Sequence, residues 1–133
     1  MGKELVVLGR PVPLSSSSPA PENRVVPLLP NIEGTMPVTL INVFSVPKAK
    51  EEEFVKWWQD VKGDITKQQG FISGKFHKSI KPDSKFNYIN VAIWENEDVY
   101  WKAYEKSVTP RKAKLQQLEV EMTPALYHVA FEY

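Results

Sequence analysis

The order of strand-like and helix-like stretches restricts the fold of this chain more than any other feature of its sequence. Alternation of side chains predicts strands, and apolar residues spaced by three and four predict helices. Strands are predicted at residues 39–46, 71–80, 86–94 and 125–133, with helical segments at 50–69, 96–109 and 112–121. The order strand, helix, strand, strand, helix, strand is that of an α+β, ferredoxin-like βαββαβ domain, in which a four-stranded antiparallel sheet carries both helices on one face.

Polar side chains interrupt the two strands that this topology places at the centre of the sheet. Asn42 lies within the apolar run 38–44, and Asn90 and Trp94 share one face of the strand 86–94. The topology brings Asn42 and Asn90 side by side, and a buried amide without a partner costs about 1–3 kcal/mol. A polar ligand pocket explains both asparagines, and a mutual hydrogen bond between the strands is the alternative. For Trp94 the alternative is a core or interface residue.

The two faces of the predicted sheet differ in composition. We expect the helices to cover the more purely apolar face, which carries Ile41, Val43, Ile89, Val91 and Ile93. The opposite face then carries Leu40, Asn42, Phe44, Tyr88, Asn90 and Trp94. So large an aromatic surface usually marks a partner or a ligand site. We therefore expect a homodimer that covers this face, with Phe44 and Tyr88 as substrate-binding residues.

Residues 1–36 differ in composition from residues 37–133. They contain the serine run 15–18, most of the prolines and no aromatic residue. A segment of this composition buries too little surface to offset its ordering entropy. We expect a Pro/Ser-rich flexible extension, with docking of residues 25–30 as an extended strand as the alternative, followed by one folded domain.

Charge and residue types exclude several classes of function. The formal net charge is +1 and cysteine is absent, so neither nucleic acid nor membrane is an expected partner, and thiolate chemistry is excluded. Without an apolar stretch of membrane-spanning length, we expect a cytoplasmic protein. His77 and His128 have no acidic cluster at ligand spacing, so we expect no metal. His77 is a candidate substrate contact or general base, and a solvated side chain is the alternative.

An RNA-recognition module has the same order of elements and is the main alternative of a different class. Phe86 and Tyr88 correspond superficially to the base-stacking aromatic residues on its third strand. The basic-Gly-aromatic-Gly signature is missing, and no arginine flanks the strand. The sequence therefore disfavours RNA binding.

The chain resembles the antibiotic biosynthesis monooxygenase family, within the dimeric α+β barrel superfamily, over about residues 36–133. The resemblance rests on the segments at 41–47, 69–73, 76–80 and 90–95. In that family, two domains pair face to face into a barrel with cavities for ligand. Some members oxidise anthrone-type polyketide intermediates of secondary metabolism to quinones with molecular oxygen, without flavin, haem or metal.

The resemblance implies a homodimeric, cofactor-independent monooxygenase that acts with O₂ on a phenolic or polycyclic aromatic substrate, anthrone- or quinol-like. It places Asn42, Asn90 and Trp94 at catalytic positions, where N–H donors would stabilise a substrate oxyanion. Tyr100 matches a tyrosine of some members and is a further substrate-binding candidate. Residues 100–108 lack the histidine of haem-degrading relatives, which disfavours haem degradation. The remaining alternative is a non-catalytic, dimeric small-molecule-binding domain.

Overall fold

A computed structural model describes residues 36–133 of the chain. Residues 1–35 lie outside the described part. The expected flexible extension over residues 1–36 and the alternative docking of residues 25–30 therefore concern residues whose structure is not described.

Four antiparallel strands form one sheet in the order β3–β4–β2–β5. Their bounds are β2 Val38–Ser45, β3 Phe71–Lys78, β4 Tyr88–Trp94 and β5 Glu121–Tyr127. β2 and β4 are the central neighbours, and their register sets Asn42 directly opposite Asn90. The predicted ferredoxin-like topology and the pairing of the two asparagines are confirmed.

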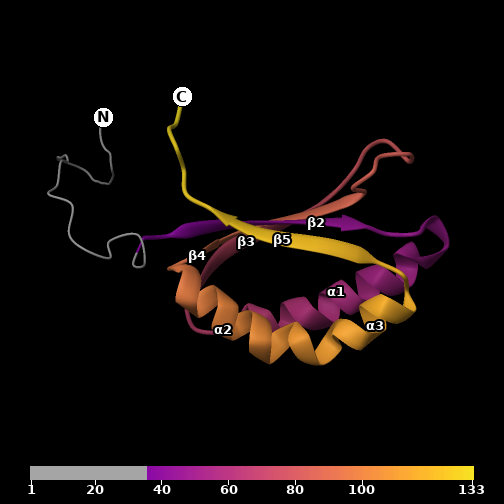
Figure 1. The fold of residues 1–133 in the computed structure, drawn as a ribbon, viewed down its shortest axis with the longest axis horizontal. Helices are drawn as coiled ribbons and strands as arrows, with labels where there is room; N and C mark the ends of the chain where they lie inside the picture. Colours follow the sequence, from indigo (N-terminus) through magenta and orange to yellow (C-terminus); the bar gives the residue numbers. More distant parts are fainter. Residues whose placement is uncertain (1–35) are drawn as a thin grey trace, which may run out of the picture. The chain divides into compact units, whose positions relative to one another are not determined.

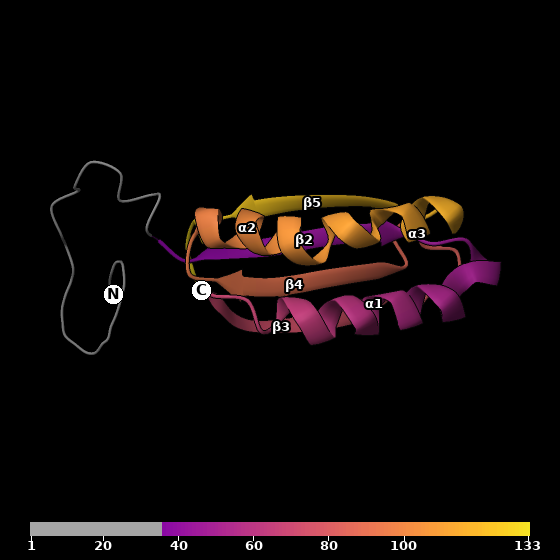
Figure 2. The same cartoon turned by 90° about the horizontal axis from the view of Figure 1, so that it is seen from below.

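All helices of the described part lie on one side of the sheet, as Figure 1 shows. They are α1 Glu51–Ile65, α2 Glu97–Ser107 and the short α3 Lys112–Gln117, with 3₁₀ turns at Lys48–Lys50 and Thr109–Arg111. In Figure 2, α1 runs along β3 and β4, whereas α2 and α3 run along β2 and β5. Asn96 caps α2 as its position in the sequence predicts, because its side chain accepts a hydrogen bond from the Val99 N–H at 3.0 Å.

The first helix is shorter than its apolar spacing predicts. It ends at Ile65 rather than Gln69, and the Thr66 hydroxyl donates to the Lys62 carbonyl at 2.7 Å where the turn begins. Gly70 then enters β3 with a φ of 94°, a conformation that side chains other than glycine rarely adopt. Gly70 therefore shapes the turn into β3 and does not end the helix.

The last strand begins earlier than predicted. It starts at Glu121 rather than Ala125 and includes Pro124, which is tolerated because β5 is an edge strand and needs no outward ladder bond there. Residues 128–133 continue beyond the sheet without regular structure. The placement of His128 on the last strand is therefore wrong.

The helices cover the opposite face of the sheet from the one expected. The side chains buried beneath them are Val38, Leu40, Asn42 and Phe44 of β2 and Tyr88, Asn90, Ala92 and Trp94 of β4. The open face carries Ile41, Val43, Ile89, Val91 and Ile93, which are partly exposed. Large side chains are needed to fill the layer between a sheet and its helices at native density, whereas β-branched side chains suit a flat sheet surface. The size of the side chains, rather than the apolar purity of a face, decides which face the helices cover.

Arg111 joins α1 to the turn before α3. Its Nε donates to Asp60 at 2.8 Å and its Nη1 donates to Asp64 at 3.1 Å. The Arg111 backbone carbonyl also accepts a hydrogen bond from the Trp57 indole at 2.9 Å. These contacts hold the helical layer together, and this layer forms one wall of the site described below.

Gly70 and Gly63 provide a matched test of the packing between this turn and α2. A Cβ at Gly70 would lie 2.3 Å from Val99 Cγ2, whereas a Cβ at Gly63 in α1 would meet nothing within 4 Å. We expect Gly70→Ala to lower the free energy of unfolding by more than about 1–2 kcal/mol, because it combines a clash with a positive φ. Gly63→Ala should raise it by about 0.5–1 kcal/mol. Urea denaturation checks both, and a Gly70→Ala variant as stable as the parent would contradict this account of the turn.

Candidate active site

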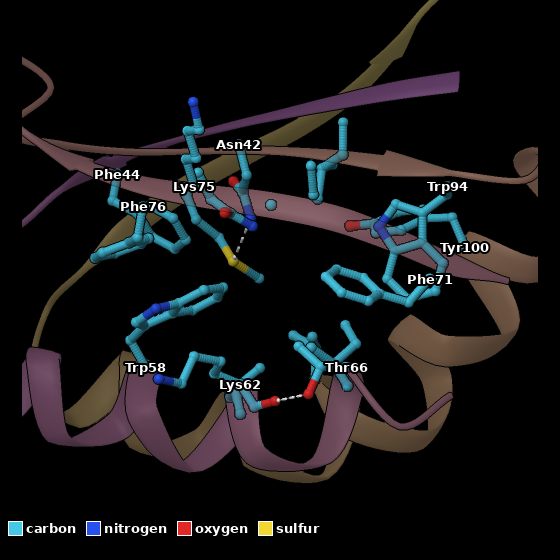
Figure 3. Close-up of a pocket in the computed structure, with 18 of the residues that line it drawn as sticks. Asn42, Phe44, Trp58, Lys62, Thr66, Phe71, Lys75, Phe76, Trp94 and Tyr100 are labelled. Carbon is cyan, nitrogen blue, oxygen red and sulfur yellow. Dashed lines mark hydrogen bonds between the residues drawn. The ribbon is translucent and has the colours of Figure 1, made fainter. Parts of the chain in front are cut away.

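A cavity of about 120 Å³ lies between the sheet and the helices. In Figure 3 the sheet residues Asn42 and Phe44 lie above it, and Lys62 of α1 and Thr66, the residue after α1, lie below it. Its walls are mostly apolar, and its most exposed lining residues belong to α1 and to the edge strand β3. Access from solvent is therefore between α1 and β3.

Two polar atoms of residues that line this cavity are buried without a hydrogen-bond partner. They are the Asn42 side-chain oxygen and the Trp94 indole nitrogen. The Asn42 amide nitrogen donates only to the Met122 sulfur, at 3.7 Å, and sulfur is a weak acceptor. Since such groups are nearly always paired in folded proteins, each asks for an explanation.

The Asn42 and Asn90 amides do not hydrogen-bond to each other, although their residues are opposite in the register. Asn90 is 7% exposed and also lines the cavity. Among the hydrogen bonds within residues 36–133, none engages its side-chain amide. The structure therefore does not contain the hydrogen bond between the Asn42 and Asn90 side chains that was the alternative to a ligand pocket.

Tyr100 of α2 adds a fourth polar group beside Trp94. It is 1% exposed, its ring packs edge-on against the Trp94 indole with centroids 5.6 Å apart, and Figure 3 shows its oxygen directed toward the cavity. Burial, with a smaller effect of the nearby Tyr104, raises the pKa of the Tyr100 phenol. Tyr100 therefore stays protonated and can donate a hydrogen bond to a ligand.

Aromatic rings form the two ends of the cavity. At one end Trp58 of α1 stacks on Phe76 of β3, with centroids 4.4 Å apart and planes 10° apart. At the other end Phe71 packs edge-on against Trp94 at 5.3 Å. Offset and edge contacts of this kind suit a flat aromatic ligand.

Trp58, Phe71 and Phe76 line the cavity without having been predicted from the sequence. One signal is present for Trp58: it begins a row with Lys62 and Thr66 at intervals of four along α1 and its C-cap, where the apolar face of the helix meets solvent. Such a row, apolar at one end and polar at the other, is typical of the rim of a cavity rather than of a closed core.

Of the four residues predicted to bind substrate, two line the cavity and two do not. Phe44 and Tyr100 line it. Tyr88 is instead part of the core, and its hydroxyl donates to Glu51 at 2.7 Å. Burial and this bond raise the Tyr88 pKa to about 12.

His77 lies on the open face of the sheet, away from the cavity. Its exposed ring has Nδ1 3.3 Å from the Ile89 carbonyl. A β-bulge between Phe71 and Ser73 shifts the alternation of β3, so that Phe71 and His77 point to opposite faces although both have odd numbers. The structure therefore places His77 on the other face of the sheet from Asn42, Asn90 and Trp94, and its contact with substrate stays a prediction.

No group of three or more His, Cys, Asp or Glu side chains that could hold a metal ion occurs within residues 36–133. In the same part of the chain, no helix is both long enough and apolar enough to cross a membrane.

Comparisons with known proteins agree on the class of fold. A ferredoxin-like protein of the dabb family from Mesorhizobium loti superposes with a TM-score of 0.55 at 11% identity, over 71% of this chain and 98% of its own. SnoaB, a cofactor-independent oxygenase from Streptomyces nogalater, superposes with a TM-score of 0.61 at 22% identity, over 73% of this chain and 96% of its own. A comparison with curated proteins found no match.

The family follows from the sequence comparison. Residues 37–114 match the family model described as antibiotic biosynthesis monooxygenase. A proposed monooxygenase from Shewanella loihica PV-4 is 33% identical, with a TM-score of 0.62 over 73% of this chain and 97% of its own. The chain belongs to the antibiotic biosynthesis monooxygenase family.

Asn42 and Asn87 test whether the unpartnered polar atoms contribute to the fold. Replacing a buried, unpaired polar group by an apolar one of similar shape is neutral or stabilising. We expect Asn42→Leu to leave the free energy of unfolding unchanged or to raise it. Asn87→Leu is the matched control: its amide bonds the Val46 N–H at 2.9 Å and the Val46 carbonyl at 2.8 Å, so its loss should cost about 1–3 kcal/mol. Equal destabilisation of the two variants in urea denaturation would show that Asn42 stabilises the fold.

Proposed function

We propose that this protein is an oxygenase that oxidises a phenolic aromatic substrate with O₂ and needs no cofactor. The observation that carries the proposal is the pair of unpartnered polar atoms, Asn42 Oδ1 and Trp94 Nε1, on residues that line a cavity with mostly apolar walls. A phenolic ring satisfies both requirements, since its plane fits between aromatic side chains and its oxygens supply the missing hydrogen bonds.

The polar groups of the cavity suit the ionised form of such a substrate. A phenol that is acidified by its own ring system loses a proton, and negative charge spreads onto ring carbon. The indole N–H of Trp94, the phenol of Tyr100 and the amide N–H groups of Asn90 are donors that stabilise this oxyanion in a site with little water. Because they are held by packing before substrate arrives, no reorganisation is needed when the charge develops.

Oxygen chemistry then needs no further protein group. The electron-rich carbon transfers an electron to O₂, and the two radicals combine to form a carbon-bound hydroperoxide. Loss of water from this intermediate leaves a carbonyl group on the carbon. One oxygen atom enters the product, the other leaves as water, and the substrate supplies all four electrons. The protein binds the substrate, orients it and excludes water from it, and the cavity residues can perform these three roles.

The dimensions of the cavity also support a reaction without a cofactor. A cavity of about 150 Å³ accommodates one benzene molecule, so a volume of about 120 Å³ holds a small ligand and leaves no space for a flavin or a haem beside it. The likeness to SnoaB, itself a cofactor-independent oxygenase, is consistent with this chemistry.

Oxygen uptake against a panel of anthrones, naphthols and hydroquinones tests the proposed function. We expect uptake with at least one phenolic class, and Asn90→Ala should lower turnover about a hundredfold, the usual effect of losing one oxyanion donor. Trp94→Phe keeps the packing and removes only the N–H, so it should have an effect of similar size. His77→Ala is the control and should change turnover less than about tenfold. Binding of phenols without any oxygen uptake would instead favour a non-catalytic small-molecule-binding domain.

We also propose that a second copy of the chain covers the open face of the sheet. Five partly exposed aliphatic side chains lie there, at Ile41, Val43, Ile89, Val91 and Ile93. Patches of this kind mark association surfaces on soluble proteins. The proposed dimer interface is therefore the aliphatic face, whereas the sequence suggested the face with Phe44, Tyr88 and Trp94.

Charge introduced at the centre of that face tests the dimer. Val91→Glu would bury a carboxylate against the partner and should give a folded monomer in sedimentation equilibrium. Ala113→Glu places the same charge on the exposed surface of α3 and should remain dimeric. A stable monomer of the unaltered protein at micromolar concentration would refute the proposal.

A further inference from the structure

Most of the large apolar side chains that stay exposed within residues 36–133 belong to two segments. One is the arm, residues 128–133, which follows β5 and has no regular structure. The other is the hairpin loop, residues 79–87, which joins β3 to β4. The exposed residues are Val129, Phe131 and Tyr133 of the arm and Ile80 and Phe86 of the hairpin loop. Exposed apolar groups that are concentrated in this way usually mark a contact with a partner.

Both segments project from the open face of the sheet. In Figure 1 the helices lie below the sheet, whereas the end marked C and the hairpin loop between β3 and β4 rise above it. The arm follows Tyr127, whose neighbour in the sheet is Thr39 near the start of β2. The hairpin loop precedes Tyr88, which pairs with Phe44 near the end of β2. The open face therefore has one apolar projection at each end.

The arm has the residue pattern of a half-buried strand. Its apolar residues alternate with His128, Ala130 and Glu132, and they continue the row of Tyr127 on the open-face side of β5. Phe131 is nevertheless 78% exposed, so this apolar row is not buried within the subunit. A surface outside the subunit accounts for the pattern.

The arm is long enough to reach a second copy that covers the open face. Sheets packed face to face are about 10 Å apart, and the strands β4 and β3 lie about 10–14 Å from β5 across the sheet at the usual strand spacing. Residues 128–133 span about 20 Å when extended, at about 3.3 Å for each residue. The arm of one subunit can therefore cross the interface and reach the strands that carry the hairpin loop of the other.

The two-fold symmetry of a face-to-face dimer allows two arrangements of these segments. If the strands of the two copies run in the same direction, the two arms lie at one end and the two hairpin loops at the other. If the strands run in opposite directions, each arm lies at the same end as the hairpin loop of the other copy, and the two contacts are equivalent.

Charge favours the second arrangement. The arm carries one acidic residue, Glu132, and no lysine or arginine, whereas the hairpin loop carries Lys81 and Lys85 against Asp83. Arm beside arm would bring two acidic side chains together and would leave two basic loops together at the other end. Arm beside hairpin loop instead pairs opposite charges at both ends.

We propose that the arm of each subunit docks on the hairpin loop of a second copy, with Phe131 packed against Ile80 and Phe86. This inference rests on the dimer proposed above and adds the segments that join the two open faces at their ends. It does not depend on the oxygenase reaction.

Cross-linking through single cysteines tests the docking in the full chain, which has no cysteine of its own. The variants Phe131→Cys and Ile80→Cys are produced separately and together in one cell, and each preparation is treated with a short bis-maleimide. We expect a covalent dimer from the co-produced variants and none from either variant alone. A covalent dimer from Phe131→Cys alone, or none from the co-produced variants, would overturn the inference.

A matched control and the oligomeric state complete this experiment. Ala113 is exposed on the helical side of the subunit, so Ala113→Cys co-produced with Phe131→Cys should give no covalent dimer. Sedimentation equilibrium of the same preparations separates the docking from the dimer itself. A dimer without the mixed cross-link would refute the docking and leave the proposed dimer standing, whereas a monomer would refute both.

The affinity of the dimer gives a second readout. Phe131→Ala should raise the dissociation constant of the dimer at least about tenfold, because each dimer loses two copies of one apolar contact. Trp101→Ala is the matched control, since Trp101 is a partly exposed aromatic residue of α2 on the helical side, and it should leave the dissociation constant unchanged. A Phe131→Ala variant that dimerises as tightly as the parent would contradict the docking.

Discussion

The register between β2 and β4 is the constraint on which the site depends. Because side chains alternate along a strand, a slip of one residue in either strand would move Asn42 or Asn90 to the open face. The observed register keeps Asn42, Asn90 and Trp94 under the helices, in the same row as Leu40 and Ala92. The flanking rings of Phe44 and Trp94, each 1% exposed, fill the space on either side of the asparagines and make any other register unfavourable. The packing of these large side chains therefore determines where the polar groups lie. The polar groups themselves contribute little to the choice of register.

Most of the fold could be predicted from local patterns. The element order, the central pairing of residues 39–46 with 86–94 and the Asn96 cap follow from alternation, helical spacing and capping chemistry. The face that the helices cover could not be predicted in this way. A hydrophobic pattern indicates how apolar each face of the sheet is, but not how much side-chain volume is needed between the sheet and the helices. Which of the two apolar faces the helices cover depends on side-chain volume. Phe44 and Trp94 supply large side chains on the covered face, whereas Ile41 and Val91 on the open face are smaller.

The candidate site was predictable in its polar residues and not in its walls. Asn42, Asn90 and Trp94 stand out because amides and an indole N–H are unusual in central strands. His77 and Tyr88 do not line the cavity, for different physical reasons: a β-bulge reverses the alternation before His77, and Glu51 at the start of α1 engages the Tyr88 hydroxyl. Neither a bulge nor a long-range hydrogen bond has a clear signal in a single sequence. The sequence does not single out Trp58, because a tryptophan on a helix is usually explained by core packing.

The fold tolerates two unpartnered polar atoms beside its cavity because their cost is confined to one part of the core. An unsatisfied buried group costs about 1–3 kcal/mol, so Asn42 and Trp94 together remove a sizeable part of the 5–15 kcal/mol that stabilises a typical domain. The deficit is local, because Phe44, Phe54 and Trp57 pack around it with centroid distances of 5.0 and 5.9 Å and keep the helices in place. A ligand that supplies the missing hydrogen bonds removes this penalty only in the folded state. Under the proposed function, part of the ligand's binding energy is thus stability that the protein lacks without it, and the groups that weaken the fold are those that recognise the ligand.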